Sequence, residues 1–162
     1  PAESTPTVEK GKVEIKGKKF QLQMNDQVVI SDQQTVWTYI KKKNEVQLQS
    51  AGDIENDPLS PFKLLQIHDS PDYTYVLAGE RKQGTNVFDI IEFKPLDTSA
   101  EFFKIRAEID RVKKQYKKLS LFLKNGDQYE LSLVSQVTKS FTDNSFVFNA
   151  NLYPGVKTED LR

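Results

Sequence analysis

Apolar and polar residues alternate along most of the chain. In one example, Phe20, Leu22 and Met24 are separated by glutamines. A period of two is typical of strands with one apolar and one polar face, as in an antiparallel sheet that is wet on one side. The pattern predicts about ten strands in near-continuous meander order. They are expected at residues 13–15, 20–24, 27–31, 35–40, 45–49, 73–77, 87–93, 103–109, 119–124 and 128–134.

Turn signals separate these strands. The strongest is Asn125-Gly126, which predicts a hairpin whose two central residues both have positive φ. Weaker turn signals fall at residues 17–18, 32–34, 43–44 and 84–86.

One short apolar helix is expected over residues 58–67. Asp57 can cap it and Pro58 suits its first position, while Leu59, Phe62 and Leu65 fall on one face, with Leu64 beside them. A helix this short is not stable alone, so it must lie on the apolar side of the sheet.

Two strands are apolar on both faces. Trp37 follows Val36 directly, Ile40 follows Tyr39, and residues 87–93 are mostly apolar. Such strands must be covered on both sides, and we expect a terminal segment to fold over the back of the sheet. A single open sheet of this size coils strongly, and one short helix cannot cover it. Either a second helical layer lies outside this chain, or the uncovered part is a site for an apolar ligand, or the sheet closes into a packed barrel.

The bulk properties exclude several classes of protein. The 162 residues suit one domain, and 23 basic residues balance 23 acidic ones, so no net charge favours nucleic acid. The absence of cysteine rules out disulfides and thiolate chemistry, and no apolar run predicts membrane insertion. Lysines cluster at residues 41–43 and 113–118, where they are either solvated strand ends or a docking patch.

The candidate chemistry is sparse. The single histidine, His68, adjoins Asp69 near the predicted end of the helix, and no nucleophile motif accompanies it. The acidic residues around 53–57 lack the spacing of a calcium loop. We therefore predict no catalytic residue, no metal, no cofactor and no nucleic-acid partner. An enzyme would need a serine beside His68 in a pocket.

Three segments resemble the LolA family of periplasmic carriers of outer-membrane lipoproteins. Residues 29–39, VISDQQTVWTY, are similar to the family's hairpin "VSDGKTLWxY". Residues 58–67 resemble its short lid helix, "TPFxLI". Residues 146–156 resemble its closing segment, "FxFxxPxGVxV", so the similarity spans residues 11–162 in the family's order.

The resemblance implies a fold and a function. The fold would be mainly β: a strongly curved antiparallel sheet that forms an unclosed half-barrel with a short lid helix, in one domain over residues 1–162. Such carriers work in the periplasm of Gram-negative bacteria. They take acylated lipoproteins from an inner-membrane ABC lipoprotein exporter to an outer-membrane receptor, with the acyl chains in a hydrophobic cavity and no catalysis.

The predicted cavity and lid residues are large apolar side chains of the strands and the helix. They are Phe20, Leu22, Val29, Trp37, Tyr39, Leu59, Phe62, Leu64, Leu65, Ile91, Phe93, Phe103, Ile105 and Leu121. For each of them the alternative is ordinary core packing.

The sequence departs from the family pattern at three places. From the resemblance we expect it to start after the family's N-terminal helix and first strand, and the turn at residues 32–34 lacks the family's glycine. The lid arginine of the family falls opposite Gly17, with Lys18 or Lys19 as a substitute. These differences indicate a divergent branch, and they leave a second function open: an outer-membrane lipoprotein receptor, or a periplasmic lipid- or lipoprotein-sensing module. An anchor cysteine at the unprocessed N-terminus would identify the receptor.

Overall fold

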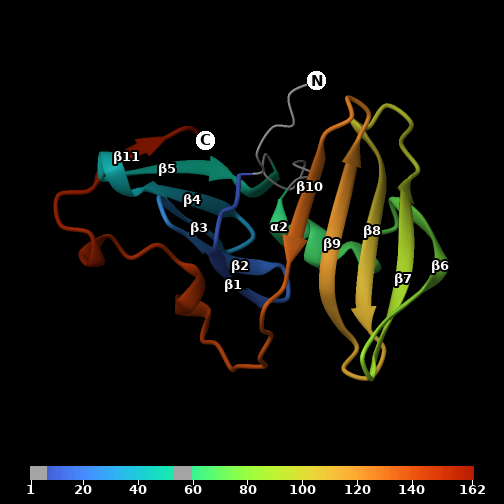
Figure 1. Ribbon diagram of the computed structural model, residues 1–162. Coiled ribbons are helices and arrows are strands. Elements are labelled where there is room, and N and C mark those ends of the chain that lie inside the picture. Colours follow the sequence, from blue (N-terminus) through green and yellow to red (C-terminus); the bar gives the residue numbers. More distant parts are fainter. Residues whose placement is uncertain (1–6, 53–59) are drawn as a thin grey trace. The chain divides into compact units, whose positions relative to one another are not determined.

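Antiparallel strands dominate the structure, as the alternating pattern predicts (Figure 1). The computed structural model describes residues 7–52 and 60–162. The strands are β1 (Gly11–Lys16), β2 (Lys19–Met24), β3 (Gln27–Ser31), β4 (Thr35–Ile40), β5 (Glu45–Ser50), β6 (Tyr73–Gln83), β7 (Asn86–Pro95), β8 (Phe102–Asp110), β9 (Gln115–Leu123), β10 (Gln128–Ser132) and β11 (Lys157–Asp160). Helix α2 spans Pro61–Leu65, and short 3-10 turns lie at Lys41–Lys43, Ile67–Asp69, Asp143–Phe146 and Ala150–Leu152.

The strands form two open sheets rather than the single sheet expected. The first sheet has the order β1-β2-β3-β4-β5-β11, and the second has the order β10-β9-β8-β7-β6. Neither sheet closes into a barrel, so the prediction of a mainly β, unclosed fold is confirmed. The chain divides into two compact units. The first unit contains Pro1–Phe62 and Lys139–Arg162, and the second contains Lys63–Thr138. The prediction of one domain stays a prediction.

The two faces of the first sheet carry different apolar sets. Cross-strand pairing places Leu22 opposite Val29, and Phe20 opposite Ser31, on one face. On the other face Val28 pairs with Tyr39, because alternate residues of a strand point to opposite sides. Apolar residues therefore lie on both faces of β3 and β4, as their sequences predict.

The C-terminal segment covers the second of these faces. Val28, Ile30, Tyr39 and Val46 form a buried cluster, and half-buried apolar residues pack against it. Those residues are Trp37, Leu48, Phe148, Tyr153 and Val156. The expectation that a terminal segment folds over the sheet is confirmed for this unit. The segment ends in β11, which pairs with β5 in parallel and was not predicted.

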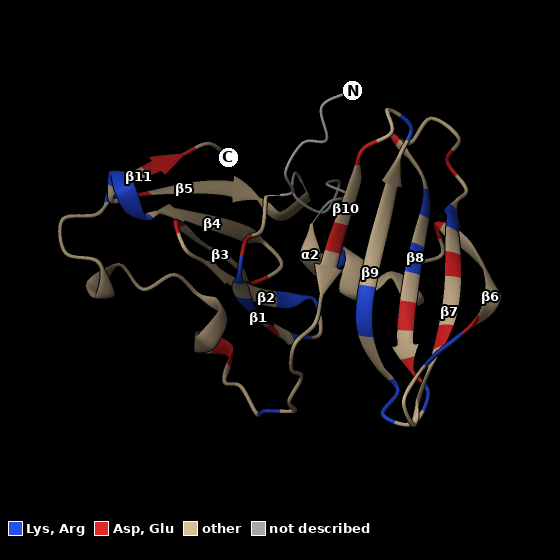
Figure 2. Cartoon of the chain, in the orientation of Figure 1, with Lys and Arg blue, Asp and Glu red and all other residues tan. Residues whose placement is uncertain are grey.

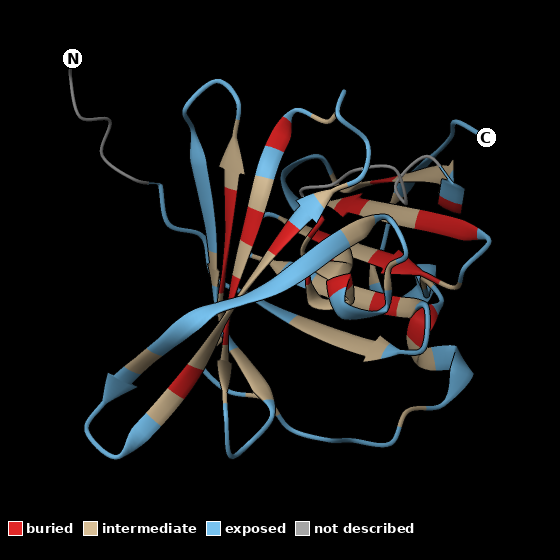
Figure 3. Ribbon diagram, turned by 90° about the vertical axis from the view of Figure 1, so that its right-hand side faces the viewer, coloured by how far each residue is buried: buried red, intermediate tan, exposed pale blue. Residues whose placement is uncertain are grey.

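The second sheet packs one face against helix α2 and the turn that follows it. The buried residues of this core are Leu64, Ile67, Phe93, Phe102, Ile105, Ala107, Leu119 and Leu121. Figure 3 shows buried positions in both sheets. The apolar faces of β7, β8 and β9 therefore form the centre of the second unit.

Helix α2 is shorter than predicted. It begins at Pro61, whose missing N–H costs nothing at the first helical position. It stops after Leu65, since Gln66 leaves the α-helical conformation at φ −108° and ψ 13° and a 3-10 turn with His68 follows. The predicted cap Asp57, together with Pro58, lies outside the described residues.

The hairpin of β9 and β10 forms where Asn125-Gly126 predicts it, but the geometry of its turn differs. The N–H of Gly126 donates to the carbonyl of Leu123, and the N–H of Leu123 donates to the carbonyl of Asp127. Only Gly126 has positive φ (95°), so the prediction of two positive values was wrong. A type I turn followed by one left-handed residue explains the difference.

Candidate functional site

Four of the predicted site residues lie together in the first unit. Phe20, Leu22 and Val29 share one face of the sheet, as their cross-strand pairs require. The ring of Phe62, in α2, stacks on the ring of Phe20 with centroids 4.5 Å apart and planes 22° apart. The helix therefore places an aromatic side chain on this apolar face, where Phe20 is buried and Phe62 half-buried.

Two other predicted residues lie on the opposite face of the same sheet. Trp37 pairs with Ile30, and Tyr39 pairs with Val28, in the cluster beneath the C-terminal segment. The Tyr39 ring lies 4.1 Å from that of Tyr153 between centroids, and its hydroxyl donates to Asn44 Oδ1 at 3.0 Å. The structure therefore divides the predicted set of this unit between two faces.

The remaining predicted residues of the sheet lie in the second unit. Ile91 and Phe93 alternate on one face of β7 and pair with Ala107 and Ile105 of β8. Leu121 is opposite Ile105 on β9. Leu64 is buried in the same cluster and Leu65 packs against it, so α2 covers this face. Ile105 and Leu121 are closed off from solvent, at 0% and 1% exposure.

Phe103 lies apart from the others. It falls at an irregularity in the pairing of β8 with β9, between Phe102 and Lys104, and is 49% exposed. Its ring contacts Phe122 at 6.3 Å between centroids. Leu59 lies outside the described residues.

Sequence reasoning missed Ile67 in the second unit. Ile67 is 2% exposed and belongs to the cluster that contains Leu64. The signal was present, since Ile67 lies three residues after Leu64 and so shares a helical face with it.

Among the described residues, the polar partners of His68 are a tyrosine and an aspartate rather than a serine. Its Nδ1 is 3.0 Å from the hydroxyl of Tyr116, and its Nε2 is 3.3 Å from a carboxylate oxygen of Asp69. Burial raises the pKa of Tyr116 to about 12, so its phenol stays protonated at neutral pH. The pair fixes the turn after α2 on β9 and supplies no nucleophile.

Two lysines near the position of the family's lid arginine pair with the C-terminal segment. Lys16 and Lys19 lie 3.0 and 3.2 Å from Asp143 Oδ1, and Lys16 also donates to the carbonyl of Phe141 at 3.1 Å. These contacts tie the returning C-terminal segment to the β1–β2 hairpin. They lower the pKa of Asp143, chiefly through the hydrogen bond from Lys16. Lys19 therefore pairs with that segment.

Several charged side chains of the second sheet form ion pairs across strands on the face opposite its core. Glu108, 7% exposed, accepts hydrogen bonds from Nε and Nη2 of Arg81 at 2.9 and 2.7 Å. Glu92 accepts from Arg106, which lowers the pKa of Glu92. This face is therefore an ion-paired surface, chemically unlike the apolar face under α2.

Other features of the described residues do not coincide with the predicted set. A hollow of about 380 Å³ is lined by Glu9, Asn25, Asp26, Lys41 and Lys42, which are all polar or charged. None of the helices in residues 7–52 and 60–162 has the length and hydropathy needed to cross a membrane.

Comparison with known proteins gives one family and several distant folds. An uncharacterised conserved protein from Thermus thermophilus shares the fold at TM-score 0.57 and 10% identity, over 88% of this chain and 75% of that one. A DUF1329 family protein from Desulfovibrio piger aligns over 78% and 62% at 16% identity, with TM-score 0.44. A LolA superfamily protein from Nitrosomonas europaea aligns over 78% and 61% at 12% identity, with TM-score 0.37. The chain thus spans about three fifths of the last two proteins. No curated protein matches.

The family model of the outer membrane lipoprotein carrier protein LolA matches residues 2–149. The match covers both units as far as the C-terminal segment. This fold is one of binding and carriage rather than catalysis, and it links the chain to lipoprotein binding or sorting. The chain belongs to the LolA family.

Proposed function

We propose that this protein is a periplasmic carrier that binds the acyl chains of lipoproteins and moves them from the inner to the outer membrane. The observation that carries the proposal is the stacking of Phe62 on Phe20 in a chain that belongs to the LolA family. An apolar side chain of the helix occupies an apolar sheet face, and an acyl chain would bind to that face in its place.

The energetics of carriage require such an occupant. Moving one methylene from water to an apolar site is worth about 0.8 kcal/mol, so a dozen methylenes are worth on the order of 10 kcal/mol. A site that was open and empty would hold its cargo too tightly to release it. If the protein's own side chains fill the site when the cargo leaves, their burial offsets part of the free energy that release costs.

Helix α2 supplies those side chains in each unit. In the first, Phe62 covers Phe20 on the face that also carries Leu22 and Val29. In the second, Leu64 is buried against the strands and Leu65 packs beside it. A helix of five residues has little stability of its own, so exchange of its contacts for those of an acyl chain costs little backbone structure.

The same proposal extends to the route and the partners. The carrier would receive acylated lipoproteins from an inner-membrane ABC lipoprotein exporter and deliver them to an outer-membrane receptor. The whole chain, residues 1–162, would act as one carrier domain. Phe20, Leu22, Val29 and Phe62 would contact the acyl chain in the first unit, and Leu64, Ile91, Phe93, Ile105 and Leu121 in the second.

The test measures binding of a fluorescent fatty acid, and then of a triacylated lipoprotein, to the full chain. Phe62→Glu should weaken binding at least tenfold (about 1.4 kcal/mol or more), because the helix side chain that would lie against the bound acyl chain then carries a carboxylate. Phe62→Ala should strengthen it, because the competing ring is gone. Val134→Glu is the matched control: Val134 is 95% exposed, so the same added charge should leave affinity unchanged.

Two outcomes would end the proposal. One is no binding of either ligand by the folded wild-type protein. The other is an equal loss of affinity in Phe62→Glu and Val134→Glu, which would trace the effect to charge alone.

A further inference from the structure

The turn between β8 and β9 presents an apolar residue at its tip. Val112 is 88% exposed. Asp110 Oδ1 accepts hydrogen bonds from the backbone N–H groups of Val112 and Lys113 at 3.0 and 2.8 Å. The N–H of Lys114 donates to the carbonyl of Asp110 at 2.8 Å, and Lys114 has φ +55°. The exposure of Val112 is therefore built into a tightly bonded turn.

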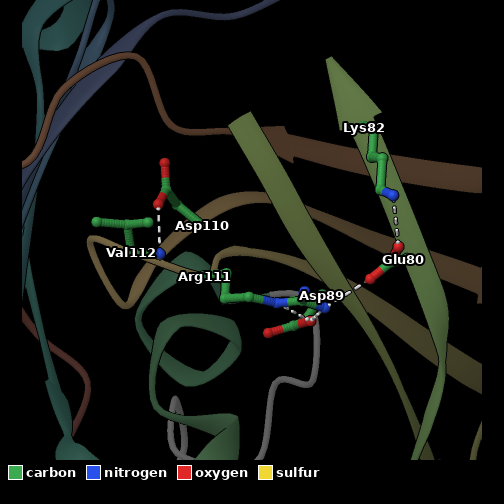
Figure 4. A network of polar contacts seen from close by, with 6 residues as sticks. All are labelled: Glu80, Lys82, Asp89, Asp110, Arg111 and Val112. Atoms are coloured by element: carbon green, nitrogen blue, oxygen red, sulfur yellow. Dashed lines mark hydrogen bonds and ion pairs between the residues drawn. The ribbon is translucent and has the colours of Figure 1, made fainter. Parts of the chain in front are cut away.

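Arg111 attaches this turn to the neighbouring hairpin of β6 and β7. Its Nε donates to Asp89 at 2.9 Å, and its Nη2 donates to Glu80 at 2.8 Å. Its backbone N–H also donates to the carbonyl of Val87 at 3.0 Å. Lys82 completes the network with an ion pair to Glu80 at 3.3 Å (Figure 4). Glu80 and Asp89 are thus engaged by Arg111 and Lys82, and Asp110 is engaged by backbone N–H groups of its own turn.

The lysines that follow Val112 lie outside this network of ion pairs, although the charge of Lys114 acts on Asp89 from a distance. Lys113 and Lys114 are exposed, and within residues 7–52 and 60–162 neither forms an ion pair. Lys117 on β9 is also exposed and forms no ion pair in that part of the chain. Basic residues gather at this turn (Figure 2). Two features therefore coincide: an exposed valine held by backbone hydrogen bonds, and ammonium groups that pair with no carboxylate of the described residues.

We propose that this tip, residues 110–114, docks on the surface of a membrane that contains anionic phospholipid. Lipid phosphates would neutralise the ammonium groups, while the valine would enter the interface between headgroups and acyl chains. One short turn therefore presents both the ammonium groups and the apolar side chain that this interface would bind. An acidic protein surface would satisfy the lysines and leave the valine exposed. The nearest aromatic residue in sequence, Tyr116, is partly buried against the core and hydrogen-bonded to His68, so it offers no face on which a nucleic-acid base could stack.

The docking should be weak and reversible. A lysine near an anionic surface contributes about fivefold to partitioning, so two or three lysines with one small apolar side chain give only transient residence. A protein that leaves one membrane to reach another needs such an interaction. The inference does not depend on acyl-chain binding, because it uses other residues and another ligand.

The experiment is co-sedimentation of the full chain with vesicles of phosphatidylcholine, with or without about one third phosphatidylglycerol. The wild type should bind the anionic vesicles only, and should be released at roughly 0.5 M salt, where screening is strong. Lys113→Gln/Lys114→Gln should lower the partition coefficient about 25-fold, and Val112→Asp should lower it at least tenfold. Circular dichroism verifies that the variants stay folded.

A matched control separates a site from general charge. Lys42 and Lys43 are also adjacent, exposed and on a short turn, but that turn, Lys41–Lys43, carries no apolar residue at its tip. Lys42→Gln/Lys43→Gln should therefore leave partitioning within about twofold of the wild type. In Val112→Trp, the added fluorescence should shift to the blue on anionic vesicles, measured against the Trp37 signal of the wild type.

The proposal is overturned by any of three results. These are equal binding to both kinds of vesicle or to neither, an equal effect of the two double lysine variants, and a Val112→Trp emission that the vesicles do not change. Fatty-acid affinity measured without vesicles on the same variants should be unchanged, so failure here remains distinct from failure of the carrier proposal.

Discussion

The rings of Tyr39 in β4 and Tyr153 in the C-terminal segment lie with their centroids 4.1 Å apart, although 113 positions separate them in sequence (153 − 39 − 1). Phe148 stacks on Tyr153 at 5.0 Å and 9°. Asn44 extends the contact by donating from Nδ2 to the carbonyl of Pro154 at 3.0 Å. The last part of the chain is thus a structural element of the first unit.

Loss of the Tyr153 ring should destabilise that unit. Tyr153→Ala removes two ring contacts over a buried cluster and should lower the free energy of unfolding by about 1–3 kcal/mol. Trp37 is the only tryptophan and packs on the same cluster, so its fluorescence in a urea titration reports on this unit. Leu152→Ala is the control, since Leu152 is 71% exposed. Equal losses in the two variants would refute the role assigned to the ring.

The turn between β3 and β4 should accept a stabilising glycine. Gln33 has φ +83°, a conformation that costs a side-chain-bearing residue about 1–2 kcal/mol and glycine almost nothing. After the entropy that glycine adds to the unfolded chain, Gln33→Gly should raise the free energy of unfolding by roughly 0.5–1 kcal/mol. Trp37 fluorescence in urea measures it. Gln34→Gly, at a position without positive φ, should lower stability, and a gain there would contradict the explanation.

Removal of Arg81 alone should destabilise the protein more than removal of both Arg81 and Glu108, because it leaves a buried carboxylate without its main partner. Arg81→Met leaves Glu108, 7% exposed, with the longer ion pair to Lys118 at 3.5 Å, and should cost about 1–3 kcal/mol after allowance for the half-exposed arginine. The double variant Arg81→Met/Glu108→Leu should recover most of that loss, because no charge is left unpaired. Urea unfolding followed by circular dichroism tests this, and additive losses would oppose it.

The contact of Asp143 with Lys16 and Lys19 should make stability depend on pH in acid. The two ammonium groups hold the pKa of Asp143 below its ordinary value of 3.8. A lowered folded-state pKa means that the stabilisation is present above pH 3.8 and is lost as the pH falls through the folded-state pKa. Thermal melts of Asp143→Asn should lie below those of the wild type near neutral pH and converge with them in acid.

Matched lysine variants test the cause. Lys16→Gln should reproduce part of the change in pH dependence, whereas Lys18→Gln should not, since Lys18 is exposed and takes no part in this contact. A parallel offset of the Asp143→Asn melts at every pH would show that the carboxylate charge is not what stabilises the segment.

Local alternation was enough to predict ten of the strands, because the period of two is fixed by the geometry of a strand. It failed for β11, whose residues Lys157–Asp160 are all exposed and carry no apolar period. That strand is held instead by pairing with β5 and by Arg162, which donates to Asp160 at 2.9 Å and to Thr35 Oγ1 at 3.3 Å. The pairing with β5 and the contact with Thr35 join residues far apart in sequence, so no local pattern predicts them.

The predicted site was harder to place, because alternation says which residues share a face and not what covers it. Val36, Trp37 and Tyr39 are all apolar, and only the register with β3 shows that Trp37 lies under the C-terminal segment while Val36 faces the other way. For Tyr75 and Leu77 the alternation predicts burial that does not occur. They alternate like core residues but are 71% and 65% exposed, because β6 is the outer strand of its sheet.

The first unit is assembled from both ends of the chain, with the second unit inserted between Phe62 and Lys139. A polypeptide that emerges from its N-terminus therefore completes the second unit while the first still lacks its closing segment. Until Phe148, Tyr153 and β11 arrive, the side chains of Val28 and Ile30 face water. Nascent molecules and C-terminally truncated molecules thus share one property. Each exposes an apolar sheet face that favours aggregation or chaperone binding.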